Sequence, residues 1–278
     1  MLKKLYLPPE KMRVLIFILL GITLVVSSCK HTRLLKSNDL TKKYEAANQY
    51  YENGKYYKAM PLLEDLIPVY RGTEKAERLY YIYAYSDYYM KDYILAAHRF
   101  NSFERMFPFS KFTEECQFMG AVCHHKLSPK YSLDQTDTYQ AIQQFELFIR
   151  QFPESKYVDS SHVLLDNMRI KLENKAFHIS KQYYKTRKYK AAIVSLNNAL
   201  NTYPDTEHRE EIYFLILKSN FYWAKYSIDS KKQERYSNTK KAYTKFAYSF
   251  PESRNMKEAL TILEKAIENL KELEKKSS

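Results

Sequence analysis

The stretch AAHRFNSFERMFPFS, residues 96–110, decides the fold, because its last four residues recur along the chain. The pattern of aromatic residue, proline, any residue and Ser or Thr is found in FPFS (107–110), FPES (152–155), YPDT (203–206) and FPES (250–253). The four prolines are 45, 51 and 47 residues apart. The segment before each proline carries apolar residues at intervals of three and four, which is typical of an amphipathic helix. The sequence therefore predicts a helical repeat.

Small residues define the phase of this repeat. Twelve residues before a proline lie Ala96, Ala141 and Ala192, and a large apolar or aromatic residue follows each of them four positions later. This spacing resembles the second helix of the tetratricopeptide repeat. The matching small position of the first helix is filled in all five repeats, by Ala47, Ala84, Ala121, Ser180 and Ser219.

The repeat also shows two insertions and three departures from the usual pattern. Repeats three and five need eight further residues between their helices, and SPKYSLDQ (128–135) is the visible case. Thr239 replaces the second-helix alanine, Asp87 stands where tyrosine is preferred, and the Trp and Gly of the repeat signature are absent. Serine two residues after a proline is expected to cap the next helix, at Ser110, Ser155 and Ser253.

Periodicity also settles the fold class. Abundant Tyr and Phe favour strands on propensity, but the spacing of three and four favours helices. We expect an all-α chain, an α-solenoid of about five tetratricopeptide-like helix pairs followed by a C-terminal helix at about 254–275.

The repeat phase separates two sets of aromatic residues. Tyrosine accounts for 27 of 278 residues, and 80–89 alone holds six. Tyr80 and Tyr83 are expected in the core. The second set is expected to face the binding groove of the solenoid, and these residues are here called the groove-side aromatics. Arg78, three residues before Tyr81, places a cation beside them. Rigid rings with a polar tip suit a binding surface for a peptide or protein. The alternative is that most of them pack between adjacent repeats. The groove-side aromatics are Tyr44, Tyr51, Tyr81, Tyr85, Tyr88, Tyr89, Phe118, Phe177, Tyr184 and Trp223.

The N-terminus indicates export and lipidation. Four Lys or Arg residues precede an uninterrupted apolar run at 14–26, which is too short to remain a membrane span. This is the pattern of a signal peptide, and Val-Ser-Ser before Cys29 looks like a bacterial lipobox. An ordinary signal peptide with a chance cysteine is the alternative. We expect a lipoprotein signal peptide at 1–28, a lipidated linker at 29–39 that anchors the chain to a membrane through Cys29, and a repeat domain at 40–275.

Composition argues against several function classes. Residues 1–28 carry four Lys or Arg and one Glu, so the other 250 residues keep +10 of the net charge of +13. The lysines that give the 250 residues their positive charge are scattered along the sequence, so no nucleic-acid partner is predicted. Four glycines and seven scattered histidines form no nucleophile motif or phosphate loop. We therefore expect no enzyme, catalytic residue, cofactor or metal site. Cys116 and Cys123 are interpreted as core thiols too far apart for a disulfide.

The lipobox, the five repeats with their insertions and the length together resemble one family, the BamD-type outer-membrane assembly lipoproteins. The resemblance covers residues 29 to about 270, and YSLDQTDT (131–138) is similar to the version found in Bacteroidota. It implies a non-enzymatic scaffold, lipid-anchored to the outer membrane. It also implies that C-terminal repeats bind a periplasmic domain of the barrel-forming assembly subunit and that N-terminal repeats bind unfolded outer-membrane proteins.

Orientation and an alternative role complete these expectations. KHTRLL (30–35) lacks acidic residues, which in that position resemble a surface-export signal, so we expect the periplasmic face. The alternative function is a generic tetratricopeptide adaptor lipoprotein of another envelope or glycan-uptake complex.

Overall fold

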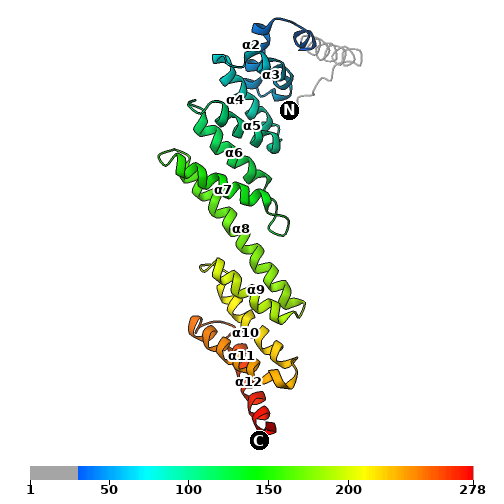
Figure 1. Cartoon of the computed structure of the whole chain (residues 1–278), viewed down its shortest axis with the longest axis vertical. Coiled ribbons are helices and arrows are strands. Elements are labelled where there is room, and N and C mark those ends of the chain that lie inside the picture. The colour runs from blue at the N-terminus through cyan, green and yellow to red at the C-terminus, as the bar shows by residue number, and fades with distance from the viewer. Residues whose placement is uncertain (1–30, 278) are drawn as a thin grey trace, which may run out of the picture. The chain divides into compact units, whose positions relative to one another are not determined.

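The computed structural model describes residues 31–277, so the predicted signal peptide and Cys29 lie outside the described residues. No β-strand occurs within this range, and the predicted all-α fold is confirmed (Figure 1). The labelled helices are α2 Leu40–Glu52, α3 Tyr56–Tyr70, α4 Glu74–Tyr89, α5 Tyr93–Met106, α6 Thr113–Leu127, α7 Thr136–Gln151, α8 Val158–Lys185, α9 Tyr189–Thr202, α10 Arg209–Lys225, α11 Asp229–Ser249 and α12 Met256–Ser277.

The helices form the five expected pairs, from α2/α3 to α10/α11, followed by α12. They belong to two compact units. Unit 1 extends to residue 164 without 129–135, and unit 2 comprises 129–135 and 165–278. Helix α8 contributes residues 158–164, about two turns, to unit 1 and the rest to unit 2.

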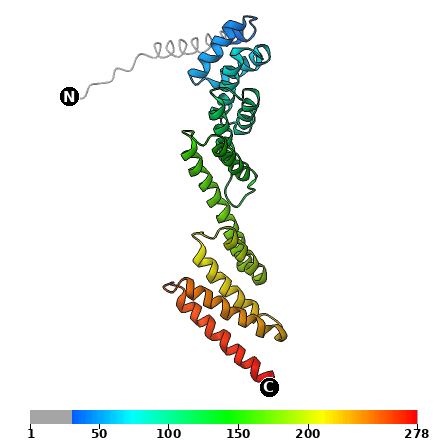
Figure 2. The same cartoon turned by 60° about the vertical axis from the view of Figure 1, so that its left-hand side comes forward.

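Each unit is held together by cores that share a helix. In unit 1, α4 contributes Ile82 to the core of α2 and α3 and Tyr85 to the core of α5 and α6. In unit 2, α10 contributes Leu215 to the core of α8 and α9 and Leu217 to that of α11 and α12. Figure 2 shows α10, α11 and α12 side by side. Sharing a helix between successive cores is how a repeat array buries a continuous interior.

The small residues that set the repeat phase all lie where two helices touch. The side chain at this position has no solvent-exposed area in either helix of any pair. Small side chains let the two backbones approach closely, so the predicted phase is confirmed. The ten residues are Ala47 and Ala59, Ala84 and Ala96, Ala121 and Ala141, Ser180 and Ala192, and Ser219 and Thr239.

The prediction of serine N-caps is wrong, because each of these serines lies in a turn ahead of the helix. Helices α6, α8 and α12 begin three residues after Ser110, Ser155 and Ser253. The hydroxyl oxygen of each serine accepts the backbone N–H two residues later, at 3.0 to 3.1 Å. It also donates to a glutamate of an earlier helix, so the side chain links two repeats before the next helix starts.

The two predicted insertions differ in structure. Residues 128–135 form a loop, in which the buried Gln135 amide donates to the carbonyls of Lys130, Leu133 and Asp134. In repeat five the turn is only 226–228, and the extra residues lengthen α11 to 21 residues, against 14 to 16 in α3, α5, α7 and α9. The expectation of an insertion in that turn is therefore wrong. The segment contains neither Pro nor Gly, so nothing in it stops a helix.

Candidate protein-binding surfaces

Among the predicted groove residues, Tyr89 in unit 1 is exposed, with 47% of its surface accessible. In unit 1, Tyr85 and Phe118 are buried, and in unit 2 Phe177 is buried. The others are half-buried, which places their rings against neighbouring side chains and leaves their edges accessible. They are Tyr44, Tyr51, Arg78, Tyr81 and Tyr88 in unit 1 and Tyr184 and Trp223 in unit 2.

Five tyrosines of α2, α3 and α4 form a contiguous aromatic cluster, here called the tyrosine seam: Tyr51, Tyr56, Tyr85, Tyr88 and Tyr89. Tyr56 stacks on Tyr89 with ring centroids 4.7 Å apart, and Tyr51 lies edge-on to Tyr56 at 5.8 Å. Tyr85 stacks on Tyr89 at 5.7 Å. The seam therefore joins repeats one and two, and Tyr89, 47% exposed, is its accessible rim.

Glu115 of α6 fixes the buried part of this aromatic surface. Tyr81 donates its hydroxyl to Glu115 Oε1 at 3.0 Å, and Tyr85 donates to the same oxygen. Burial raises the pKa of both tyrosines above the usual range, and the neighbouring carboxylate raises it further. Both hydroxyls therefore stay protonated and act as donors. This ties repeat two to repeat three and makes Tyr85 a packing residue as well as a groove residue.

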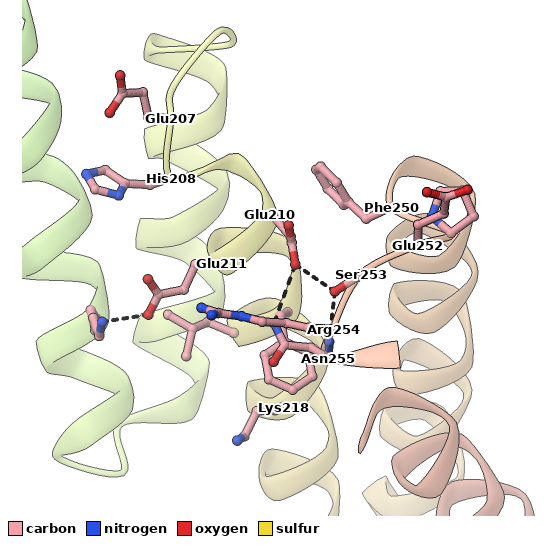
Figure 3. A pocket seen from close by; sticks show the side chains of 14 residues that line it. Glu207, His208, Glu210, Glu211, Lys218, Phe250, Glu252, Ser253, Arg254 and Asn255 are labelled. Carbon is pink, nitrogen blue, oxygen red and sulfur yellow. Dashed lines mark hydrogen bonds and ion pairs between the residues drawn. The ribbon is translucent and has the colours of Figure 1, made fainter. Parts of the chain in front are cut away.

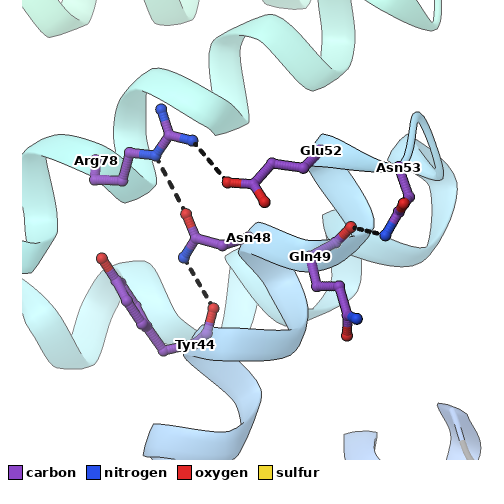
Figure 4. Close-up of polar contacts among 6 residues, drawn as sticks. All are labelled: Tyr44, Asn48, Gln49, Glu52, Asn53 and Arg78. Atoms are coloured by element: carbon purple, nitrogen blue, oxygen red, sulfur yellow. Dashed lines mark hydrogen bonds and ion pairs between the residues drawn. The ribbon is translucent and has the colours of Figure 1, made fainter.

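Arg78 of α4 reaches polar side chains of α2 (Figure 4). Its Nε donates to Asn48 Oδ1 at 3.2 Å, and its Nη2 lies 3.7 Å from a carboxylate oxygen of Glu52. The guanidinium carbon is 5.6 Å from the ring centroid of Tyr51 and 5.8 Å from that of Tyr81. This ion pair is long, and it is also solvated because the Glu52 side chain is 66% exposed. A competing carboxylate can replace Glu52 at little cost.

Phe118, Phe177 and Trp223 contact local partners outside the tyrosine seam. In unit 1, Phe118 stacks on Tyr157 at 4.6 Å. In unit 2, Phe177 stacks on His208 at 4.0 Å, and the Arg235 guanidinium lies 4.0 Å from the Trp223 ring centroid. These rings are therefore positioned by packing against a neighbouring helix or turn.

A second surface, which sequence reasoning missed, is a groove of about 1130 Å³ in unit 2, here called the C-terminal groove (Figure 3). It is lined by α8, α10 and the segment that leads into α12. Lys181 pairs with Glu211 at 2.5 Å, and Glu210 accepts a hydrogen bond from Ser253 at 2.6 Å. Arg254 is exposed in the lining. Such mixed charge suits a polar surface of a folded partner.

One signal in the sequence points to this groove. A glutamate at the start of the first helix recurs with the Ser or Thr of the repeated motif, as Glu77 with Ser110 and Glu210 with Ser253. Their separations of 33 and 43 residues differ because of the insertion, which hides the pairing in a simple periodicity search.

The structure also bears on the cysteines, on metal binding and on membrane-spanning helices. Cys116 and Cys123 are free and buried, and burial raises the pKa of both thiols, that of Cys123 to about 12. Within residues 31–277, no group of three His, Cys, Asp or Glu side chains is arranged to hold a metal ion. No helix in this part of the chain has the length and apolar character needed to span a bilayer.

Comparison with known proteins identifies the family of this chain. The sequence model of the family YfiO, described as outer membrane lipoprotein, matches residues 36–224. A curated relative, the outer membrane protein assembly factor BamD of Rickettsia prowazekii (strain Madrid E), is 25% identical over 213 residues, which is 75% of this chain and 84% of the relative. Because the family model covers well over half of the sequence, from the first helix pair into α10, this chain belongs to the outer membrane lipoprotein family YfiO.

Proposed function

We propose that the chain is a non-enzymatic scaffold lipoprotein of the machinery that assembles β-barrels in the outer membrane. It is anchored through Cys29 on the periplasmic face. Unit 1 receives the C-terminal segment of an unfolded outer-membrane protein, and unit 2 holds a periplasmic domain of the barrel-forming subunit. Family membership and the likeness to an assembly factor support the general role.

The environment of Arg78 carries the substrate part of the proposal. A barrel strand that ends in an aromatic residue presents a ring and a free carboxylate together. Arg78 offers a cation whose carboxylate partner, Glu52, is distant and solvated, and it is flanked by Tyr51 and Tyr81. An incoming carboxylate can form a bidentate pair with the guanidinium while its ring packs on the tyrosines.

The substrate site is tested with a fluorescent peptide that copies the C-terminal strand of an outer-membrane barrel. Arg78→Gln should weaken its binding about tenfold or more, because a charged hydrogen-bond pair is lost. Amidating the peptide's C-terminus should weaken binding to the wild type by a similar factor. The two changes together should cost little more than either alone, because they remove the same contact.

Lys126→Gln is the matched control for this titration. Lys126 is an exposed cation in the last turn of α6, so the same charge is removed from unit 1 outside the proposed site. Equal affinity of wild type and Arg78→Gln for the free-carboxylate peptide would sink the substrate assignment. Tyr89→Ala removes a ring at the exposed rim of the tyrosine seam without changing the charge. Its peptide affinity therefore measures the contribution of aromatic contact alone.

The partner site is tested by co-purification of the full chain with the barrel-forming subunit. Arg254→Glu, in the C-terminal groove, should reduce recovery of that subunit and leave peptide binding to unit 1 unchanged. Lys257→Glu, exposed on α12 but outside the groove lining, is the control. Failure of the wild-type chain to recover any barrel-forming subunit would favour the adaptor role in another envelope complex.

A further inference from the structure

A second hollow in unit 2 combines cations with aromatic rings. It has a volume of about 680 Å³ and lies between the α8–α9 turn and the α10–α11 turn. Its cations are Arg187, Lys188, Lys190 and Arg235, and its lining includes no acidic side chain. This size is in the range of pockets that hold a small ligand or a headgroup.

The four cations are not neutralised by the rest of the described chain. Within residues 31–277, none of them forms an ion pair with Asp or Glu. The nearby carboxylate of Asp229 is engaged by Lys232 at 2.8 Å. Four clustered cations without counter-charges favour an anionic ligand.

Arg235 is held in place without losing its charge. Its guanidinium lies over the Trp223 indole, 4.0 Å from the ring centroid, and donates to the hydroxyl of Ser227. Ser227 in turn donates to the carbonyl of Trp223. The remaining N–H groups of Arg235 are free to bind an anion in a fixed geometry.

The rim of the hollow is aromatic and apolar. Tyr189 stacks nearly parallel on Tyr226, with centroids 6.1 Å apart and planes inclined by 11°. Tyr226 is 64% exposed and Ile228, in the same turn, is 72% exposed. Exposed Tyr and Trp beside Lys and Arg are the composition of surfaces that meet the headgroup region of a membrane.

We propose that this hollow binds the phosphate of an anionic glycerophospholipid headgroup, with Tyr226 and Ile228 entering the adjoining boundary with the acyl chains. The hollow is lined by two short turns and by single residues of the helices beside them, so it fits a headgroup better than an extended peptide. Family membership places the chain at a lipid surface, which supplies the anion. This membrane contact is additional to the lipid anchor and independent of the proteins bound by the other surfaces.

Trp223 provides a reporter inside the site, because it is the single tryptophan of the sequence. The full chain in a non-ionic detergent is titrated with short-chain dihexanoyl phosphatidylglycerol. Calorimetry measures binding and Trp223 emission locates it. We expect saturable binding with a change in Trp223 emission, and weaker binding at high salt because the contact is electrostatic.

The variant Arg187→Asn with Lys190→Gln removes two of the lining cations. Asn is chosen because Arg187 has a backbone φ of 60°, a conformation that Asn tolerates. Loss of two charged contacts should weaken phosphatidylglycerol binding by roughly tenfold or more. The control, Lys240→Gln with Lys241→Gln, removes the same charge from exposed positions of α11 outside the hollow and should leave binding unchanged.

Three further ligands distinguish the source of the anion. Dihexanoyl phosphatidylcholine has the same chains without net charge, glycerol 1-phosphate has the phosphate without chains, and a glutamate-rich peptide is an anionic protein segment. Weaker binding of all three supports the proposal. Equal or tighter binding of any of them, or equal phosphatidylglycerol affinity of wild type and the Arg187→Asn, Lys190→Gln variant, overturns it.

Discussion

At the scale of single residues, Asp87 in α4 is the most unusual side chain of unit 1. It is 1% exposed, and its carboxylate pairs with Arg99 of α5. The Arg99 guanidinium also lies 3.4 Å from the ring centroid of Tyr83. Burial raises the pKa of Asp87, and Arg99 only partly offsets this. Burying a carboxylate of this kind costs free energy unless a counter-charge such as Arg99 accompanies it.

Removing that partner should destabilise the fold in a pH-dependent way. Arg99→Met should lower the free energy of unfolding by about 3–5 kcal/mol at neutral pH, because a buried carboxylate loses its counter-charge. The raised pKa means that folded Asp87 binds a proton more tightly than unfolded Asp87, so lowering the pH through the raised pKa favours the folded state. The deficit should therefore shrink in acid. Denaturant titrations at several pH values measure it, and a deficit independent of pH would contradict the explanation.

Three turns between paired helices share one backbone geometry. Gly54, Lys91 and Arg187 have positive φ angles of 68°, 66° and 60°. In each turn the N–H of the next residue bonds to the carbonyl five positions earlier, which is the Schellman ending of a helix. Glycine adopts this conformation freely, whereas a side chain with a Cβ atom is strained there.

Relieving this strain should stabilise unit 1. Lys91→Gly should raise the free energy of unfolding by about 0.5–1 kcal/mol, because the cost of the left-handed conformation exceeds the added entropy of the unfolded glycine. The reciprocal change, Gly54→Ala, should lower it. Thermal melting of both variants provides the measurement, and a lower melting midpoint for Lys91→Gly would count against the assigned turn geometry.

At the scale of elements, a recurring hydrogen bond links the repeats. The Ser or Thr of each Pro-x-Ser/Thr motif donates to a glutamate of an earlier first helix, which lies in the first turn of α4, α6 and α10 and in the middle of α8. Three of these bonds measure 2.5 to 2.6 Å, and a fourth joins Ser155 to Glu114. Because a carboxylate is the acceptor, each bond is stronger than one between neutral groups. The measured three are Ser110 with Glu77, Thr206 with Glu173, and Ser253 with Glu210.

Loss of one such bond should loosen the docking of the following helix. Ser253→Ala should lower the free energy of unfolding by about 1–2 kcal/mol. Ser249→Ala, at the exposed end of α11, is the matched control and should have little effect. Hydrogen exchange should show the loss in α12 first, since repeats contact only their neighbours. Equal stability of the two variants would show that the bond contributes nothing.

At the scale of the whole molecule, the proposed membrane anchor is Cys29, which lies outside the described residues. One acyl chain binds a membrane only marginally, whereas a diacylglyceryl cysteine holds stably. Cys29→Ala should leave the chain unprocessed or released from the membrane fraction. Cys116→Ala is the control, because that thiol is buried in α6 and should not affect anchoring. Fractionation of cells measures the outcome, and membrane retention of the processed Cys29→Ala chain would argue against lipidation.

The local pattern was sufficient for the helix pairs and their phase. Proline boundaries, small residues and a spacing of three and four depend only on neighbours in the chain, so Ala96 and Ala192 could be placed at helix contacts from the sequence. The same pattern could not show which rings of the tyrosine seam are buried and which are exposed. The buried Tyr85 donates a hydrogen bond from its hydroxyl to Glu115, 30 residues later in the chain.

Sequence alone therefore determined that this chain is an array of tetratricopeptide-like helix pairs with a lipoprotein-like N-terminus. Tertiary structure decided that, among the described residues, the carboxylate that pairs with Arg78 is distant and solvated, and that cations of the α8–α9 turn, α9 and α11 meet in one hollow. The physical reason is the separation along the chain of the residues that interact. Helix periodicity arises from bonds between residues four apart, whereas these contacts join residues tens of positions apart, whose meeting depends on how successive helices pack.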